Sequence, residues 1–212
     1  MFFDNVNEIE KNHKEKKMRL FWRLFGLLVI GCCLIWAGGV ENPRVTIKTG
    51  LGEITIEIYE KDAPITAANF LKYVDEGRYK DGCFYRIVTM DNQPNNDIKI
   101  EVIQGGLSEE TRGNMLSPIK HETTDKTGIL HKNGVISMAR LKPGTASSEF
   151  FICVGDQPEL DFEGRRNPDG QGFSAFGKVV KGMNVVKKIH QQPAEGQMLD
   201  PRIKIFDITR IE

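Results

Sequence analysis

The 212-residue sequence has no excess of charge of either sign, because 29 lysine and arginine residues are matched by 29 aspartate and glutamate residues. The basic residues are dispersed, and no stripe of aromatic residues is interleaved with them. A nucleic-acid-binding domain usually shows a basic patch together with a recognisable motif. The sequence therefore gives no support to nucleic-acid binding.

Several short enzyme motifs are also missing. The sequence contains no glycine-rich dinucleotide or phosphate loop, no HExxH zinc motif and no CxxC pair. Ser147 and Ser148 lack the sharp strand-to-helix turn that surrounds a hydrolase nucleophile. We expect no metal and no cofactor, because the four histidines have no ligand spacing: His13, His121, His131 and His190.

Cysteine is scarce. Cys32 and Cys33 lie in an apolar N-terminal run, which leaves only Cys83 and Cys153 for the rest of the chain. Both stand in strand-like runs, CFYRIV and FFICV, where a free cysteine usually behaves as a small buried hydrophobic residue. We expect two free thiols there. A disulfide between them is the alternative, since export would permit one.

Charge is absent from one long stretch near the N-terminus. Residues 24–40 contain no charged residue, whereas residues 1–23 before them are rich in lysine and arginine. The apolar length is at the lower limit of the about 17–25 residues that span a bilayer. By the positive-inside tendency, residues 1–23 stay cytoplasmic and residues 41–212 form an exported domain, periplasmic in a bacterium.

Three interpretations of residues 24–40 stay open. Small residues at 37–39 fit a signal peptide that is cleaved, and a translation start at Met18 would favour that reading. An uncleaved transmembrane helix fits equally well, because the basic region is unusually long. A lipoprotein signal at Cys32 fits less well, since an apolar run follows that cysteine. A buried core helix is disfavoured by the basic flank and the terminal position.

Residues 41–212 consist of short apolar segments that alternate with turn-forming residues. Ile54, Ile56 and Ile58 alternate with polar residues, which predicts a β-hairpin over residues 45–59. Helices are predicted at residues 64–76 and 183–190 from apolar positions on one face. Further strands are predicted at 84–88, 98–103, 134–139, 150–154, 173–179 and 203–211. Many short strands with two helices favour a mainly β fold, a closed antiparallel barrel capped by the helices.

Six separated runs carry a resemblance to a known family. The chain resembles the cyclophilins, a family of peptidyl-prolyl cis-trans isomerases, over roughly residues 45–211. The resemblance implies an eight-stranded cyclophilin-like barrel and keeps the family's order of motifs. The runs are Ala63–Phe70 (APITAANF), Phe84–Val88 (FYRIV), Val102–Gly106 (VIQGG), Gly134–Ala139 (GVISMA), Ser148–Ile152 (SEFFI) and Phe176–Val179 (FGKV).

The resemblance also implies which residues form the site. Arg86 corresponds to the family's catalytic arginine, and Gln104 to its active-site glutamine. No cofactor is implied, and the expected partners are proline-containing polypeptides bound by a monomer, with the membrane as a second partner through the N-terminal segment. The residues expected to bind substrate are Phe151, Val102 and Leu160, which form an apolar cup for the proline ring, with Met138, Ala139, Glu149 and Phe173 around it.

The chemistry of the reaction suits these residue types. An Xaa-Pro bond isomerises over a barrier of about 18–20 kcal/mol, because rotation removes amide resonance. The catalyst needs no covalent step; it must favour the twisted state, in which the proline nitrogen can accept a hydrogen bond. Arginine is suited to this, because it is permanently charged and rich in donors.

Five positions depart from the family's pattern. A polar insertion at residues 89–97 precedes Glu101, which stands where the family has an aromatic residue. The rim is therefore expected to be more acidic, and we expect weak inhibition by cyclosporin. A membrane-tethered peptide-binding module or holdase with little turnover is the alternative to an isomerase that folds exported chains. The other departures are Glu149 for glutamine, Phe173 for histidine, Arg140 for asparagine and Glu159 for tryptophan.

Overall fold

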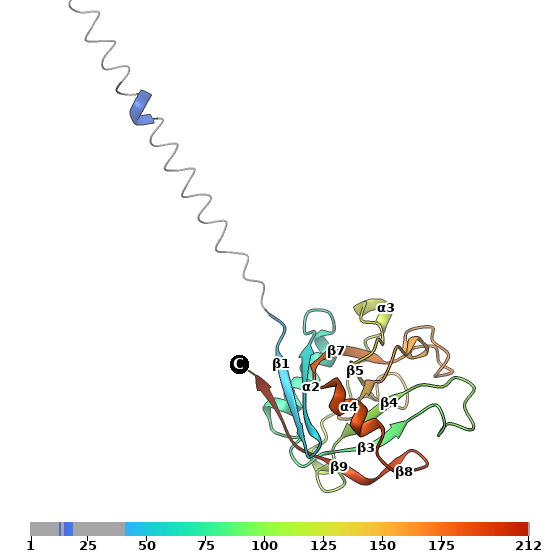
Figure 1. Ribbon diagram of the computed structural model, residues 1–212. Helices are drawn as coiled ribbons and strands as arrows, with labels where there is room; N and C mark the ends of the chain where they lie inside the picture. The colour runs from blue at the N-terminus through green and yellow to red at the C-terminus, as the bar shows by residue number, and fades with distance from the viewer. Residues whose placement is uncertain (1–12, 14, 19–40, 212) are drawn as a thin grey trace, which may run out of the picture. The chain divides into compact units, whose positions relative to one another are not determined.

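The computed structural model describes residues 13, 15–18 and 41–211 of the chain (Figure 1). The chain divides into two units, Met1–Glu41 and Asn42–Glu212. The predicted apolar segment at residues 24–40 lies outside the described residues. Among the residues that are described, no helix combines the length and the apolar character needed to cross a bilayer.

The second unit is a closed antiparallel barrel, as predicted. Eight strands pair in the order β1-β2-β7-β5-β6-β4-β3-β9, and β9 pairs back with β1, so that the sheet has no free edge along these strands. A short ninth strand, β8, pairs only with β9 and forms a hairpin with it. The strands are β1 (Arg44–Thr49), β2 (Gly52–Ile58), β3 (Cys83–Val88), β4 (Val102–Gly106), β5 (Val135–Met138), β6 (Phe150–Cys153), β7 (Ser174–Lys181), β8 (Ala194–Glu195) and β9 (Met198–Ile211).

The first hairpin shows how the sequence pattern builds the barrel. In β2, Ile54, Ile56 and Ile58 are fully buried, and the residues between them are partly exposed. Ile47 of β1 stands directly opposite Ile54. Alternate residues of a strand point to opposite faces, so this hairpin places its isoleucines inside the barrel and its polar side chains outside. The predicted hairpin is confirmed.

Two longer helices pack against the barrel, α2 (Pro64–Asp75) and α4 (Met183–His190), and both were predicted (Figure 1). Helix α2 begins with a proline, and Glu122 supplies its N-terminal cap from a distant loop. The Glu122 carboxylate accepts hydrogen bonds from the backbone N–H groups of Ile65 at 3.2 Å and Thr66 at 2.7 Å. Shorter helical turns are α3 (Thr124–Thr127), η1 (Arg112–Asn114) and η2 (Pro158–Leu160).

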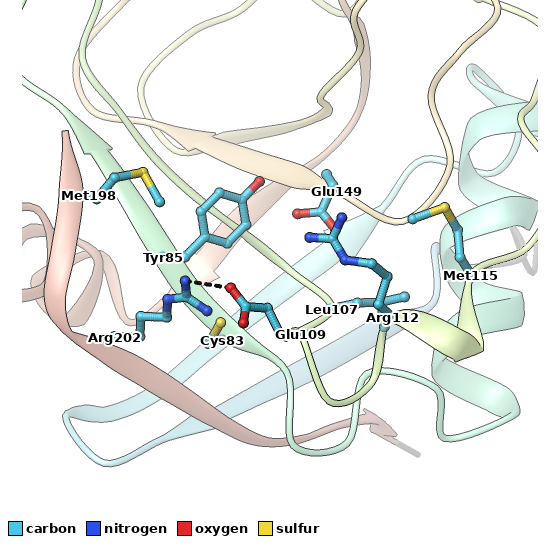
Figure 2. A pocket seen from close by; sticks show the side chains of 9 residues that line it. All are labelled: Cys83, Tyr85, Leu107, Glu109, Arg112, Met115, Glu149, Met198 and Arg202. Carbon is cyan, nitrogen blue, oxygen red and sulfur yellow. Dashed lines mark hydrogen bonds and ion pairs between the residues drawn. The ribbon is translucent and has the colours of Figure 1, made fainter.

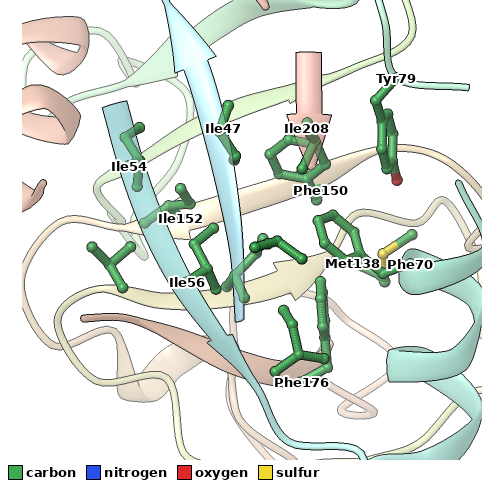
Figure 3. Close-up of a cluster of buried hydrophobic side chains, with 14 of the residues drawn as sticks. Ile47, Ile54, Ile56, Phe70, Tyr79, Met138, Phe150, Ile152, Phe176 and Ile208 are labelled. Atoms are coloured by element: carbon green, nitrogen blue, oxygen red, sulfur yellow. The ribbon is translucent and has the colours of Figure 1, made fainter. Parts of the chain in front are cut away.

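The apolar side chains form two separate clusters. The larger one fills the barrel (Figure 3). Its aromatic rings meet edge to face: the centroid of the Phe150 ring lies 5.7 Å from that of Phe70 and 5.8 Å from that of Phe84. The smaller cluster is separate from this core and has Ala139 and Phe173 packed against it. Its buried members are Val88, Ile100, Val102, Phe151, Cys153 and Leu160.

Two details differ from the sequence-based expectation. Strand β4 begins at Val102 rather than at residue 98. The backbone N–H and C=O of Ile100 form hydrogen bonds with the side chain of Gln93 and not with a neighbouring strand. Strand β9 begins five residues earlier than predicted, at Met198. Cys83 and Cys153 are both free thiols, since β4 lies between the strands that carry them.

Candidate active site

Three adjacent strands place the predicted site residues in a row. Arg86 of β3 stands opposite Gln104 of β4, and Gln104 stands opposite Phe151 of β6. Strand neighbours lie about 4.7–4.9 Å apart, so the row extends across one small patch of the barrel's outer surface. The pairing brings residues 86, 104 and 151 together although they are far apart in the chain.

Arg86 is held from both sides by glutamine side chains. Its Nη1 donates to Gln104 Oε1 at 2.8 Å, and its Nε and Nη2 donate to Gln197 Oε1 at 3.0 and 2.6 Å. A planar guanidinium with three of its donors engaged in this way has one preferred orientation. Gln197 was not found from the sequence, because it lies 111 positions further along the chain in the turn between β8 and β9.

Gln197 also connects this turn to the polar insertion. Its Nε2 donates to the carbonyl of Asn92 at 3.0 Å, and Asn92 donates back to the carbonyl of Gly196 at 3.1 Å. The insertion at residues 89–97 is therefore tied to the hairpin that positions Arg86. It is part of the support of the site and not a free surface loop.

The charge of Arg86 is not neutralised by an acid. Its pKa is lowered because burial removes water from the guanidinium, but an arginine remains protonated at neutral pH. Within residues 41–211, its side-chain partners are neutral amide oxygens, and it forms no ion pair. The positive charge is thus fixed in place and available to a ligand.

Beside Arg86 lies a cup of about 270 Å³ that is lined by both apolar and polar side chains. Its floor is the Phe151 ring, which is 4% exposed and contacts Phe173 edge to face at 5.2 Å. His131 stacks on the Phe151 ring, with the two ring centroids 5.9 Å apart. The cup is lined by Arg86, Ile100, Val102, Gln104, Ala139, Arg140, Leu141, Phe151, Leu160, Arg166, Asn167 and Phe173.

Arg140 supports one wall of the cup through its contacts with Phe173 and Asp169. Its guanidinium lies 5.1 Å from the centre of the Phe173 ring, and it forms a two-pronged ion pair with Asp169 at 2.7 and 2.9 Å. Hydrogen bonding to Arg140 is the main cause that lowers the pKa of Asp169 to about 2. The loop around Asp169, residues 162–171, is thereby fastened to the wall.

Seven of the nine predicted site residues line this cup: Arg86, Gln104, Phe151, Val102, Leu160, Ala139 and Phe173. The other two lie elsewhere. Met138 is the last residue of β5 and is fully buried in the barrel core, whereas the next residue, Ala139, packs against the smaller cluster and lines the cup. Glu149 lines two adjoining hollows together with Tyr85.

At position 101, where the family has an aromatic residue, this chain contributes nothing to the cup, but the preceding residue does. Glu101 does not line the cup, whereas Ile100 is 7% exposed and does. Arg166 was also missed, and it donates to the carbonyl of Ile98 at the end of the insertion. The sequence signals were the polar insertion at residues 89–97 and the polar loop at residues 162–171, which contains Arg166. Among the described residues, no group of His, Cys, Asp or Glu is placed to hold a metal ion.

Comparisons with known proteins agree with this geometry. Residues 44–210 match the family described as cyclophilin type peptidyl-prolyl cis-trans isomerase/CLD. The chain is 38% identical to a peptidyl-prolyl cis-trans isomerase of Acinetobacter baylyi, over 78% of this chain and 81% of that one. It is 36% identical to peptidyl-prolyl cis-trans isomerase B of Escherichia coli, over 68% and 82%.

The fold has a close counterpart among solved structures. A cyclophilin type peptidyl-prolyl cis-trans isomerase of Cryptosporidium parvum, crystallised in the presence of the dipeptide Ala-Pro, superposes with a TM-score of 0.63. It is 24% identical, over 80% of this chain and 99% of that one. The family match and the identity to these relatives agree with the barrel and with the row of Arg86, Gln104 and Phe151. The chain belongs to the cyclophilin-type peptidyl-prolyl cis-trans isomerase family and is an isomerase of that type.

Proposed function

We propose that the cup around Phe151 binds the proline ring of an Xaa-Pro bond and that Arg86 is the catalytic residue. The observation that carries this proposal is the position of Arg86: a fixed, unneutralised guanidinium that lines the same cup as the Phe151 ring. Gln104 orients Arg86 through its Oε1 and is the second residue of the site. Val102, Leu160, Ala139 and Phe173 complete the cup.

The proposed mechanism uses the fixed charge. As the amide twists, its conjugation is lost and the proline nitrogen gains a lone pair that can accept a hydrogen bond. Arg86 is placed to hold the carbonyl before the proline or to donate towards the proline nitrogen. Either bond is stronger in the twisted state than in the planar one, so it lowers the barrier and not merely the free energy of the bound substrate.

Proline-containing polypeptides are the proposed substrates. The Cryptosporidium parvum relative was crystallised in the presence of the dipeptide Ala-Pro, which supports this class of ligand. A peptide-binding module without turnover was suggested by two acidic residues, Glu101 and Glu149. Neither lines the cup, so the isomerase is the better-supported reading.

The roles of Arg86 and Phe151 are separable by kinetics. Arg86→Lys keeps the charge but loses the planar fork, so kcat is expected to fall at least tenfold with little change in KM. Phe151→Leu keeps the chain folded but reshapes the cup, so KM is expected to rise more than kcat falls. Equal and small effects of both changes on an Ala-Pro-Phe peptide would contradict this assignment.

We further propose that the domain acts outside the cytoplasm on exported chains, with the N-terminal segment as anchor or cleaved signal. The support is the basic region at residues 1–23 followed by the uncharged run at residues 24–40. The mass of the protein isolated from membranes separates the two forms. When the outer membrane is permeabilised and the inner membrane is left intact, added protease should reach an exported domain. Protection of residues 41–212 in that experiment would contradict export.

A further inference from the structure

A second hollow, of about 300 Å³, adjoins the site on the other side of Tyr85. Tyr85 lines this hollow, and Figure 2 shows its hydroxyl end on the same side as the carboxylate of Glu149. The other residues of the hollow include two arginines and a second carboxylate, Glu109, which is paired with Arg202 at 3.1 Å. None of these residues lines the proline cup.

A chain of hydrogen bonds leads from Arg86 to this hollow. Arg86 Nη1 donates to Gln104 Oε1 at 2.8 Å, and Gln104 Nε2 donates to the Tyr85 hydroxyl oxygen at 2.6 Å. The first bond fixes the direction of the second, because an arginine can only donate and the oxygen of Gln104 must therefore face it. The Tyr85 oxygen thus acts as an acceptor, and its own hydrogen is free to turn towards another acceptor.

Glu149 lines the same two hollows as Tyr85, and its carboxylate lies on the side of that hydroxyl (Figure 2). Burial raises the pKa of Tyr85, and the charge of Glu149 raises it further; burial also raises the pKa of Glu149, and Tyr85 opposes that rise. Ser148 Oγ also donates to Glu149 Oε1 at 3.1 Å. The space for this carboxylate exists because residue 106 is glycine: a Cβ there would lie 2.7 Å from the carboxyl atoms.

We propose that Glu149 and Tyr85 are positioning residues that keep the amide of Gln104 in the one orientation that holds Arg86. An ionised carboxylate can only accept hydrogen bonds. It draws the Tyr85 hydrogen to itself, so the Tyr85 oxygen presents a lone pair to Gln104 Nε2. With a neutral group at position 149, the Tyr85 hydrogen is free to turn towards Gln104, so the Tyr85 oxygen no longer holds Gln104 Nε2 and the Gln104 amide is held by Arg86 alone. The proposal rests on the catalytic role of Arg86 proposed above.

The protonation of Glu149 makes the proposal testable by pH. Burial raises the pKa of Glu149 above its ordinary value of 4.5, opposed by its bonds to Tyr85 and Ser148, the Leu107 backbone and the charge of Arg112. The carboxylate therefore gains its proton at a higher pH than an exposed glutamate would. Activity is expected to fall on the acidic side as Glu149 protonates. The other titratable groups facing the hollow are Cys83, Glu109 and Arg202.

The test uses the full-length chain with three variants. Glu149→Gln replaces the acceptor-only group by an amide of the same size, and Tyr85→Phe removes the hydroxyl. Glu109→Gln is the matched control, because it neutralises another carboxylate of the same hollow that has no link to Gln104. Isomerisation of an Ala-Pro-Phe peptide is measured between pH 5 and pH 8, and each profile is scaled to its own maximum.

We expect kcat to fall about fivefold or more in Glu149→Gln and Tyr85→Phe, with KM changed less than twofold and Glu109→Gln unaffected. The double variant should lose no more than Tyr85→Phe alone, because both act through one glutamine. The fall in isomerase activity on the acidic side of the pH profile, called the acidic limb, should be present in the parent and absent in Glu149→Gln. An unchanged limb in Glu149→Gln, or additive losses in the double variant, would overturn the proposal.

A second measurement is independent of turnover. The side-chain amide protons of Gln104, followed by NMR in the parent chain, should shift with the same pH midpoint as Glu149 and should not shift in Tyr85→Phe. If the amide titrates but the parent has no isomerase activity, the proposed function fails and the positioning stands. If the amide does not respond to pH, the positioning fails whatever the activity.

Discussion

Gln197 offers the sharpest prediction about how Arg86 is held. Its Oε1 accepts from Arg86 Nε and Nη2, whereas Gln104 accepts only from Nη1. Replacing Gln197 by alanine removes two of the three bonds that orient the guanidinium. The guanidinium then keeps its charge but gains rotational freedom, so a smaller share of the molecules has Arg86 directed at the bound peptide.

The size of the effect follows from the bonds lost. A hydrogen bond to a charged group contributes about 1.5–3 kcal/mol net. Arg86 is half-buried, so water replaces part of this, and a net loss near the lower bound of about 1.5 kcal/mol is expected from the pair. Since about 1.4 kcal/mol corresponds to a factor of ten, kcat/KM should fall roughly tenfold.

The assay is isomerisation of an Ala-Pro-Phe peptide followed by exchange NMR, which needs no coupling protease. Gln192→Ala is the matched control, because Gln192 lies in the preceding turn and its side chain donates to the carbonyl of Lys188, not to a residue of the site. A melting curve shows that both variants remain folded. If Gln197→Ala retains kcat/KM within twofold of the parent, the orientation of Arg86 does not depend on the hairpin and the reasoning is refuted.

Three further predictions follow from other contacts. Glu122→Ala should cost about 1–2 kcal/mol of unfolding free energy by removing the cap of α2, visible as a lower Tm with unchanged activity at 25 °C; an unchanged Tm would contradict this. Asp169 has its pKa lowered to about 2, so its pairing with Arg140 stabilises the fold above the ordinary pKa of 3.8, and that contribution is lost as the pH falls through about 2. Acid unfolding curves of the parent and Asp169→Asn should therefore converge at the lowest pH, and curves that stay parallel would show that the pair does not contribute. Cyclosporin should inhibit weakly, since the acidic Glu159 is half-buried and paired with Arg165 at 2.8 Å, and a sub-micromolar inhibition constant would be inconsistent with that expectation.

The barrel was largely predictable from local patterns. The alternation of Ile54, Ile56 and Ile58 fixed the face of β2, and the bounds of α4 agree with the apolar spacing of residues 183–190. The start of β4 was not predictable in this way, because residues 98–100 look strand-like. Their backbone groups are instead taken by Gln93, a side chain whose reach no pattern indicates.

The sequence predicted the site residues correctly where the family resemblance pointed to residues on the outward face of a strand. Val102 and Gln104 share that face, as residues two apart do, and both line the cup. Met138 was predicted beside Ala139, although adjacent strand residues point to opposite faces, and it lies in the barrel core. Gln197 could not be found, because its contact with Arg86 depends on closure of the whole barrel.

The most direct test of the central claim is the rate of Xaa-Pro isomerisation by the full-length chain and by Arg86→Ala. The account predicts clear acceleration above the uncatalysed rate by the parent and a loss of most of it in the variant, with both proteins folded to the same extent. A folded parent without acceleration, or a variant as active as the parent, would contradict the claim that Arg86 is the catalytic residue of this isomerase.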